Sequence, residues 1–130
     1  MDFNISINFE KADTSGKTVA GWASVASVDG TPVTDYQGDI ISIDELRKAA
    51  HKFVCDARVA KAMHAGNQVG EVVESVIVDD DLAKALGITD GKRGWWVRMQ
   101  IHDPEIQKGV REGKYRAFSI GGKGRRTPTE

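Results

Sequence analysis

The sequence predicts an α+β fold, a small and mostly antiparallel β-barrel or curled sheet flanked by helices. Strand-like alternation of apolar and polar residues recurs along the chain. The turns between neighbouring strand patterns are short, which favours antiparallel pairing. Helical patterns stand between groups of strands rather than after each strand, so a doubly wound parallel sheet is not indicated. The predicted order of elements is β-β-α-β-β-α-β-α-β.

The first half of the chain contributes two strands and a helix. Strands are predicted at residues 4–10 and 18–28, and we expect them to pair with each other. The segment 35–41 places two carboxylates around a glycine, which favours a turn over a calcium loop because no further oxygen ligands follow at regular spacing. Ser42 and Glu45 form a capping box that begins a helix. Cys55 continues the helical pattern and is expected to be a small buried hydrophobe.

The second half alternates strands with short helices. Residues 58–63 form a short extended piece that leads His64 into a loop. The valine-rich strand at residues 69–78 breaks strict alternation, which predicts burial on both faces or a bulge. Short helices are predicted at residues 82–86, closed by Gly87, and from Pro104 to about residue 113. Strands are predicted at residues 95–101 and 115–119.

Composition excludes several classes of function. A chain of 130 residues suits one domain, 1–130, which we expect to be the N-terminal part of a longer chain or a complete unit. The net charge of −1 argues against nucleic acid as a partner. The only cysteine stands in no Cys/His metal motif, and no apolar run reaches the length of a membrane span. We therefore expect no metal, no cofactor and no membrane.

The last predicted strand carries the candidate chemistry. It ends at Ser119, and glycines at 121, 122 and 124 follow. A fixed serine oxygen beside backbone N–H groups is what acyl transfer requires, although a strand ending in a glycine-rich turn with a basic tail has the same pattern. The base candidates are His51, His64 and His102, of which the loop residue His64 is preferred. The acids Glu71, Glu74, Asp39 and Asp103 are available as a third member, and spacing does not decide among them.

Several motifs in order resemble the phage prohead (capsid-maturation) serine proteases, and most closely the group typified by XkdF. His64 precedes Ser119 by 55 positions, which is 119 − 64. The resemblance covers residues 22–124. Its motifs are Gly21-Trp22-Ala23-Ser24-Val25, Asp35-Tyr36-Gln37-Gly38-Asp39-Ile40-Ile41, Met63-His64, Val69-Gly70-Glu71-Val72-Val73-Glu74-Ser75, Gly94-Trp95-Trp96-Val97 and the run from Tyr115 to Gly122.

The resemblance implies a fold shared with the assemblins, a small β-barrel surrounded by helices. It implies Ser119 as nucleophile and His64 as general base. Glu74 is chosen as the third member from the residues alone, because a hairpin after His64 would bring Glu71 or Glu74 near it. The oxyanion would be held near Gly121 and Gly122, helped by Arg125 or Arg126. Substrates would be phage scaffold and major capsid proteins, and the enzyme itself, cleaved inside the immature prohead in the host cytoplasm. Such enzymes are commonly homodimers.

Two other functions remain open from the sequence. A catalytically silent module of the same fold would bind scaffold or capsid protein through an exposed apolar patch, with Trp95 or Trp96 as its candidate centre. A nucleic-acid-binding β-barrel would use Lys123, Arg125 and Arg126 with Tyr115 and Phe118, and the overall charge argues against it.

Overall fold

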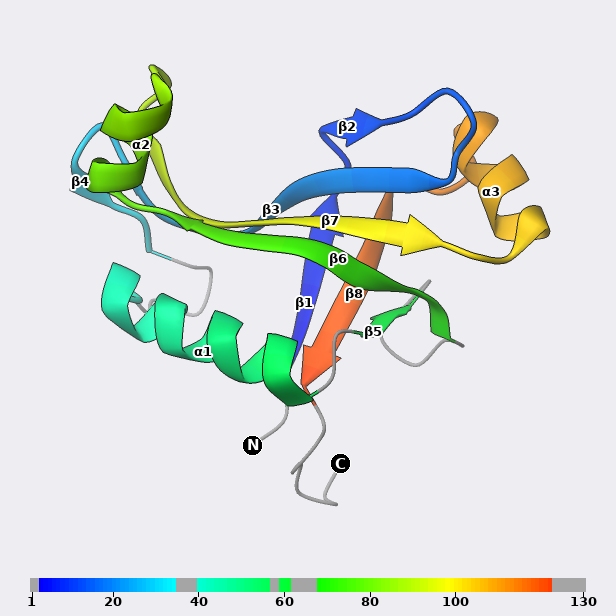
Figure 1. The fold of residues 1–130 in the computed structure, drawn as a ribbon, viewed down its shortest axis with the longest axis horizontal. Helices are drawn as coiled ribbons and strands as arrows, with labels where there is room; N and C mark the ends of the chain where they lie inside the picture. The colour runs from blue at the N-terminus through cyan, green and yellow to red at the C-terminus, as the bar shows by residue number, and fades with distance from the viewer. Residues whose placement is uncertain (1–2, 35–39, 57–58, 62–67, 123–130) are drawn as a thin grey trace.

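The computed structural model describes residues 3–34, 40–56, 59–61 and 68–122 (Figure 1). The predicted order of elements is confirmed, with two short strands added. The strands are β1 (Phe3–Asn8), β2 (Lys11–Ala12), β3 (Thr18–Val28), β4 (Thr31–Pro32), β5 (Val59–Lys61), β6 (Gln68–Val78), β7 (Lys92–Ile101) and β8 (Ala117–Gly122). The helices are α1 (Ile43–Asp56), α2 (Asp80–Leu86) and α3 (Pro104–Arg111).

The strands form one sheet in the order β1-β8-β5-β6-β7-β3-β2, with β4 paired to β3. Every ladder between named strands is antiparallel. The two ends of this order, β1 and β2, belong to one N-terminal stretch, so the sheet curves back towards itself. Gly21 of β3 leaves room for the Asn8 carbonyl of β1, since a Cβ there would collide with it. No ladder joins β1 to β3 among the described residues, so the predicted barrel is not closed.

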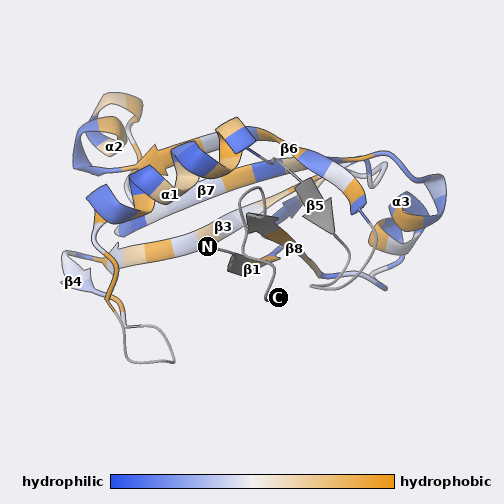
Figure 2. Ribbon diagram, turned by 90° about the horizontal axis from the view of Figure 1, so that it is seen from below, coloured by the Kyte–Doolittle hydropathy of each residue, from blue (hydrophilic) through white to orange (hydrophobic). Residues whose placement is uncertain are grey.

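The core lies between α1 and the sheet, as Figure 2 shows with α1 across one face. Alternate residues of β7 point into it, and Trp95, Val97, Met99 and Ile101 are almost completely buried. The Phe53 ring of α1 packs against Trp95 edge to face, with ring centroids 5.8 Å apart. This contact holds the helix to the middle of the sheet, because two large aromatic surfaces leave water together.

The helix boundaries follow the capping signals in the sequence. Ser42 Oγ accepts from the Glu45 N–H at 3.1 Å, and Glu45 Oε1 accepts from the Ser42 N–H at 3.3 Å. Helix α2 begins after Asp79 and ends at Gly87, whose φ of 69° is the left-handed conformation that glycine adopts at low cost. These predictions are confirmed because each depends on residues only a few positions apart.

Two predictions about the strands are wrong. The first predicted strand does not pair with the second: β1 pairs with β8, and only the two residues of β2 pair with β3. The last strand does not end at Ser119. It continues to Gly122, because Gly121 and Gly122 lie opposite Asn4 and Phe3 in the ladder with β1.

Residues 35–39, which carry the predicted turn, lie outside the described residues. The bulge predicted in residues 69–78 is confirmed, since the register between β6 and β7 shifts between Val72 and Glu74. Among the three described helices, none has the length and apolar character that a membrane span needs.

Candidate active site

Ser119 lies in the middle of β8, between Phe118 and Ile120. Those two side chains are buried in the core, so the side chain of Ser119 projects from the opposite face of the strand. Ser119 is only 3% exposed. Its Oγ has no hydrogen-bond partner among the described residues. A buried hydroxyl without a partner costs about 1–3 kcal/mol of stability. Among the buried side-chain nitrogen and oxygen atoms of the described residues, only this oxygen lacks a partner.

Two strands flank Ser119. Its Cα partners are Ser6 of β1 and Lys61 of β5. Strand β5 then forms a hairpin with β6, in which Lys61 lies opposite Gln68. The connection of this hairpin, residues 62–67, contains His64 and lies outside the described residues. The topology therefore places the strand that leads to His64 directly beside Ser119, and the position of His64 itself stays a prediction.

The two glutamates of β6 differ in whether β5 pairs with them. Glu71 lies opposite Val59, within the hairpin. Glu74, the predicted third member, lies three residues further along β6, beyond the last residue that pairs with β5. Its Oε1 accepts from Arg98 Nε at 3.0 Å, and its side chain is exposed. The structure therefore gives Glu74 a partner of its own on β7, and its catalytic role stays a prediction.

Glu71 has a partner that sequence reasoning missed. Its Oε1 lies 2.7 Å from His102 Nε2, and both side chains are partly exposed. His102 follows β7 directly, and its backbone N–H donates to the Val69 carbonyl of β6 at 3.1 Å. The pairing of β6 with β7 brings the two residues together, and no local motif in the sequence marks it. Asp103 caps α3, accepting from the Glu105 N–H at 2.8 Å.

Of the predicted oxyanion residues, the structure describes Gly121 and Gly122. Gly121 and Gly122 belong to β8, where they follow Ser119 along the same strand. Arg125 and Arg126 lie outside the described residues. The basic tail of the nucleic-acid hypothesis lies there too. Phe118, which that hypothesis needs on the surface, is buried at the core.

Two side chains named in the sequence analysis lie elsewhere than expected. Cys55 is exposed, not buried, because it falls outside the face of α1 that Leu46, Ala50 and Phe53 bury. Trp95 is completely buried, so it cannot centre an exposed patch. Trp96 is on the opposite face and packs against Trp22 with ring centroids 5.3 Å apart.

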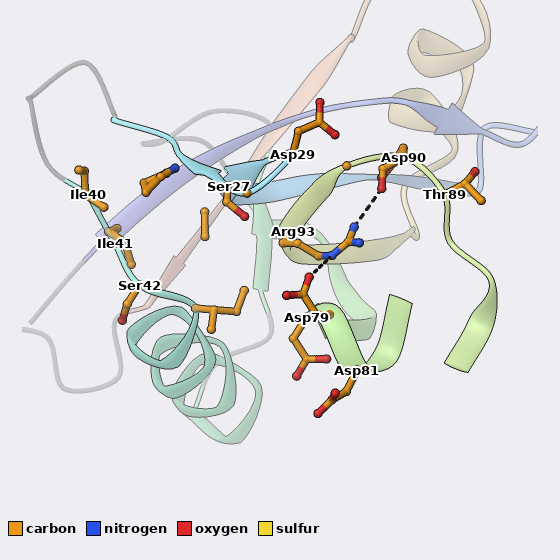
Figure 3. Close-up of a pocket in the computed structure, with 16 residues that line it drawn as sticks. Ser27, Asp29, Ile40, Ile41, Ser42, Asp79, Asp81, Thr89, Asp90 and Arg93 are labelled. Carbon is orange, nitrogen blue, oxygen red and sulfur yellow. Dashed lines mark hydrogen bonds and ion pairs between the residues drawn. The ribbon is translucent and has the colours of Figure 1, made fainter. Parts of the chain in front are cut away.

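A cleft of about 820 Å³ lies away from the Ser119 strand (Figure 3). It lies where β3 and β7 meet the start of α1 and α2, and none of its described lining residues belongs to β5 or β8. Five aspartates line it: Asp29, Asp79, Asp80, Asp81 and Asp90. Arg93 is held there by the Asp80 carboxylate at 2.9 Å and by the carbonyls of Asp90 and Lys92.

Three acids of this cleft, Asp79, Asp80 and Asp90, have structural partners. The Leu82 N–H and then the Arg47 guanidinium lower the pKa of the Asp79 carboxyl below its usual 3.8. Arg47 Nη2 donates to Asp79 Oδ2 at 2.6 Å, which ties α1 to the start of α2. Within the described part of the chain, no group of three or more His, Cys, Asp or Glu side chains could hold a metal ion. Helix capping therefore explains Asp79, and ion pairing with Arg93 explains Asp80.

Comparison with known proteins gives one family and two relatives. The family described as "Putative phage serine protease XkdF" matches residues 7–128. The uncharacterized protein YqbD of Bacillus subtilis (strain 168) is 35% identical over 89 residues, which cover 68% of this chain and 27% of that protein. The phage-like element PBSX protein XkdF of the same organism is 31% identical over 91 residues, covering 69% of this chain and 32% of that protein.

The chain thus spans about a third or less of the length of these curated relatives. No solved structure matches it. The family match covers the Ser119 strand, the β5–β6 hairpin and the segment that contains His64. The resemblance to the XkdF group, stated from the sequence motifs, is confirmed.

Proposed function

The chain belongs to the family of the putative phage serine protease XkdF, and from that premise we propose that it is a serine endopeptidase with Ser119 as nucleophile. His64 is the general base in this proposal. The observation that carries it is the Ser119 Oγ, which is buried and has no hydrogen-bond partner among the described residues. Unpaired buried hydroxyls are rare in folded proteins, and a catalytic role is one of the accepted reasons for keeping one.

Chain connectivity supports the pairing of Ser119 with His64. Lys61 lies opposite Ser119, and His64 follows three residues later. Three residues of chain span at most about 11 Å, and paired strands lie about 5 Å apart. Chain length alone therefore limits the separation of the His64 and Ser119 Cα atoms to about 16 Å, which permits contact between the two side chains. No equivalent constraint acts on His51, which is on the exposed side of α1.

The reaction follows from these positions. Ser119 Oγ attacks the carbonyl carbon of the scissile peptide bond, and His64 accepts the serine proton. The tetrahedral oxyanion is stabilised by backbone N–H groups of β8 near Gly121. His64 then returns the proton to the leaving amine, which leaves an acyl-serine. Water, deprotonated by His64, hydrolyses this ester and restores the serine.

The third group of the site is proposed among the glutamates of β6. Glu74 is the residue chosen from the sequence, and it would have to leave Arg98 to orient His64. Glu71 is nearer in register to β5 and already orients a histidine, His102. The two can be separated by pH–rate profiles of Glu71→Gln and Glu74→Gln, because loss of the orienting acid changes the apparent pKa of the base.

The proposed substrates are the scaffold and major capsid proteins of the phage, and the enzyme itself, cut inside the immature prohead in the host cytoplasm. The family description and the phage-like element named for one relative support this setting. A homodimer is proposed as the working form. Substrates, location and oligomeric state are properties of a whole protein, and this chain spans about a third of the length of the relative XkdF.

A second candidate function is favoured by one observation. Ser119 Oγ is covered in this structure, so a substrate cannot reach it without movement of the groups that cover it. A catalytically silent module that binds scaffold or capsid protein would have no need of such movement. In that case the unpaired Ser119 hydroxyl would have no function and would only cost stability.

A fluorophosphonate probe and intact mass spectrometry distinguish these functions. We expect one adduct on the wild type, located at Ser119 by peptide mapping, and none on Ser119→Ala or His64→Ala. Ser6→Ala is the matched control, because Ser6 lies opposite Ser119 on β1 and is exposed. No adduct on the folded wild type, as monomer or dimer, would favour the silent module. An adduct that persists on Ser119→Ala would show that another residue reacts and would contradict Ser119 as the nucleophile.

A further inference from the structure

The face of β8 that is turned away from the core carries only small residues. Phe118 and Ile120 of this strand are buried in the core. Successive residues of a strand alternate between its two faces, so the outer face belongs to the residues on either side of these two. Those residues are Ala117, Ser119 and Gly121, which we call the small-residue strip. No side chain in the strip extends beyond its Cβ except for the single oxygen of Ser119.

The outer face of the neighbouring part of the sheet has a different character. On β7 the outer positions carry Trp96, Arg98 and Gln100, which alternate with the core residues of that strand. Trp96 packs there against Trp22 of β3, with ring centroids 5.3 Å apart. Arg98 Nε donates to Glu74 of β6 at 3.0 Å. Large side chains therefore stand on the outer face over β3, β6 and β7, whereas β8 has none of its own there.

The middle of the small-residue strip holds a hydroxyl that the fold does not satisfy. Ser119 is 3% exposed, and its Oγ has no hydrogen-bond partner among the described residues. Small side chains by themselves would be explained by packing alone. A buried hydroxyl without a partner costs about 1–3 kcal/mol, so its presence in the middle of the strip points to a ligand that lies against β8.

The strip is open to water on the side of β1. Ser6 and Asn8 of β1 lie opposite Ser119 and Ala117 in the ladder, and both are exposed. Ala117 itself is partly exposed, although Ser119, two residues further along the same face, is buried. Among the described residues, open surface therefore approaches the Ser119 hydroxyl over Ala117 and from β1.

The reach of a serine hydroxyl limits the distance between the substrate main chain and β8. Oγ lies two single bonds from Cα, which is roughly 2.5 Å. A carbonyl carbon in position for attack lies about 3–3.5 Å from the nucleophile. The substrate main chain must therefore come within about 6 Å of the main chain of β8. Sheets that pack through full-sized side chains lie about 10 Å apart, so this approach is much closer than ordinary packing.

We infer that the substrate is an extended segment whose residues beside the scissile bond are glycine, alanine or serine; this inference rests on the proposed function. An approach within about 6 Å leaves no room for a large side chain on either surface. The enzyme meets this requirement through Ala117 and Gly121, which lie on either side of Ser119 in the strip. The side chains that the substrate directs towards β8 must be equally small. Ala117 and Gly121 are thus specificity-determining residues.

Aminoalkyl diphenyl phosphonates test this size preference on the wild-type chain. Each reagent carries one amino-acid side chain beside the phosphorus atom that the serine attacks. We expect the alanine analogue to modify Ser119 at least about tenfold faster than the leucine and phenylalanine analogues, as measured by intact mass and located by peptide mapping. Methanesulfonyl fluoride is the reference reagent, because it is small and has no main chain that must lie against β8. It should modify Ser119 and report the reactivity of the hydroxyl itself.

A substitution within the strip provides the second measurement. Ala117→Leu is expected to slow the alanine phosphonate at least about tenfold and methanesulfonyl fluoride far less, because leucine fills the space that the substrate main chain needs. Ala12→Leu is the matched control, since Ala12 is an exposed strand alanine on β2, and it should keep both rates. Thermal unfolding of the two variants shows whether they are folded.

The outcomes separate this inference from the proposed function. If methanesulfonyl fluoride modifies Ser119 but the alanine and phenylalanine phosphonates react at equal rates, the size preference is wrong and the proposed nucleophile stands. If neither kind of reagent modifies Ser119 in the folded wild type, the proposed function is wrong and the substrate preference with it. The comparison on the wild type needs no substitution, so it decides the matter even where Ala117→Leu does not fold.

Discussion

Two serines of the sheet, Ser75 in β6 and Ser119 in β8, differ in how the fold uses their hydroxyls. Ser75 Oγ accepts a hydrogen bond from Trp95 Nε1 at 2.8 Å. That bond satisfies the indole of a completely buried tryptophan, so Ser75 is explained by the core alone. Ser75 is half-buried, whereas Ser119 is buried and its Oγ has no partner among the described residues. The two serines thus differ in burial and in partner, and a hydroxyl that is buried without a partner is the stronger indication of a functional serine.

The largest expected effect concerns the satisfied serine. Ser75→Ala leaves Trp95 Nε1 buried without an acceptor, and we expect the free energy of unfolding to fall by about 1–3 kcal/mol. Urea denaturation followed by tryptophan fluorescence measures this change. In a Trp95→Phe background, which has no N–H, the same Ser75→Ala substitution should cost much less. An equal cost in both backgrounds would show that Ser75 contributes packing rather than the hydrogen bond.

Ser119→Ala is expected to have a smaller effect of opposite sign. Removing a buried hydroxyl that has no partner should leave the free energy of unfolding unchanged, or raise it by up to about 1 kcal/mol. The measurement is the same denaturation experiment, with Ser75→Ala as the contrasting variant. A clear loss of stability would mean that Ser119 Oγ has a structural partner, and the contrast between the two serines would disappear.

The smallest expected effect is a pH dependence of stability that comes from Asp79. This residue directly follows β6, the strand that contains Ser75. The pKa of this carboxyl is lowered from 3.8 by the Leu82 N–H and by Arg47, so its ionised form is favoured in the folded protein. Its contribution to stability is present above pH 3.8 and is lost as pH falls through the lower, folded-state pKa.

Thermal denaturation from pH 7 to acid measures this contribution. Asp79→Asn should lower the melting temperature at neutral pH, and its difference from the wild type should shrink as the pH falls. Asp81→Asn in the first turn of α2 is the control and should show little of this pattern, since no hydrogen bond or ion pair of its side chain is found in the described structure. A difference that grows towards acid would contradict the assigned sign.

The candidate site was predictable in its residue types and only partly in its geometry. The serine followed by glycines, and the histidine in a loop after an extended piece, were visible as patterns. The pairing of Glu71 with His102 was not, because those residues are 31 positions apart and meet only through the ladder of β6 with β7. Glu71 and Glu74 lie three positions apart in the same strand pattern. The short length of β5 and their different partners, His102 and Arg98, distinguish them.

The sequence by itself determined the order of the elements, the start of α1, the ends of α2, the bulge in β6 and the alternation of β7. Each depends on hydrogen bonds or periodicity within about ten residues, where the chemistry of neighbours is sufficient. Tertiary structure alone decided that β1 pairs with β8 and that β8 continues through its glycines. Such pairings join residues more than a hundred positions apart. They depend on which edges remain free once the core around Trp95 has formed, and no local pattern records that competition.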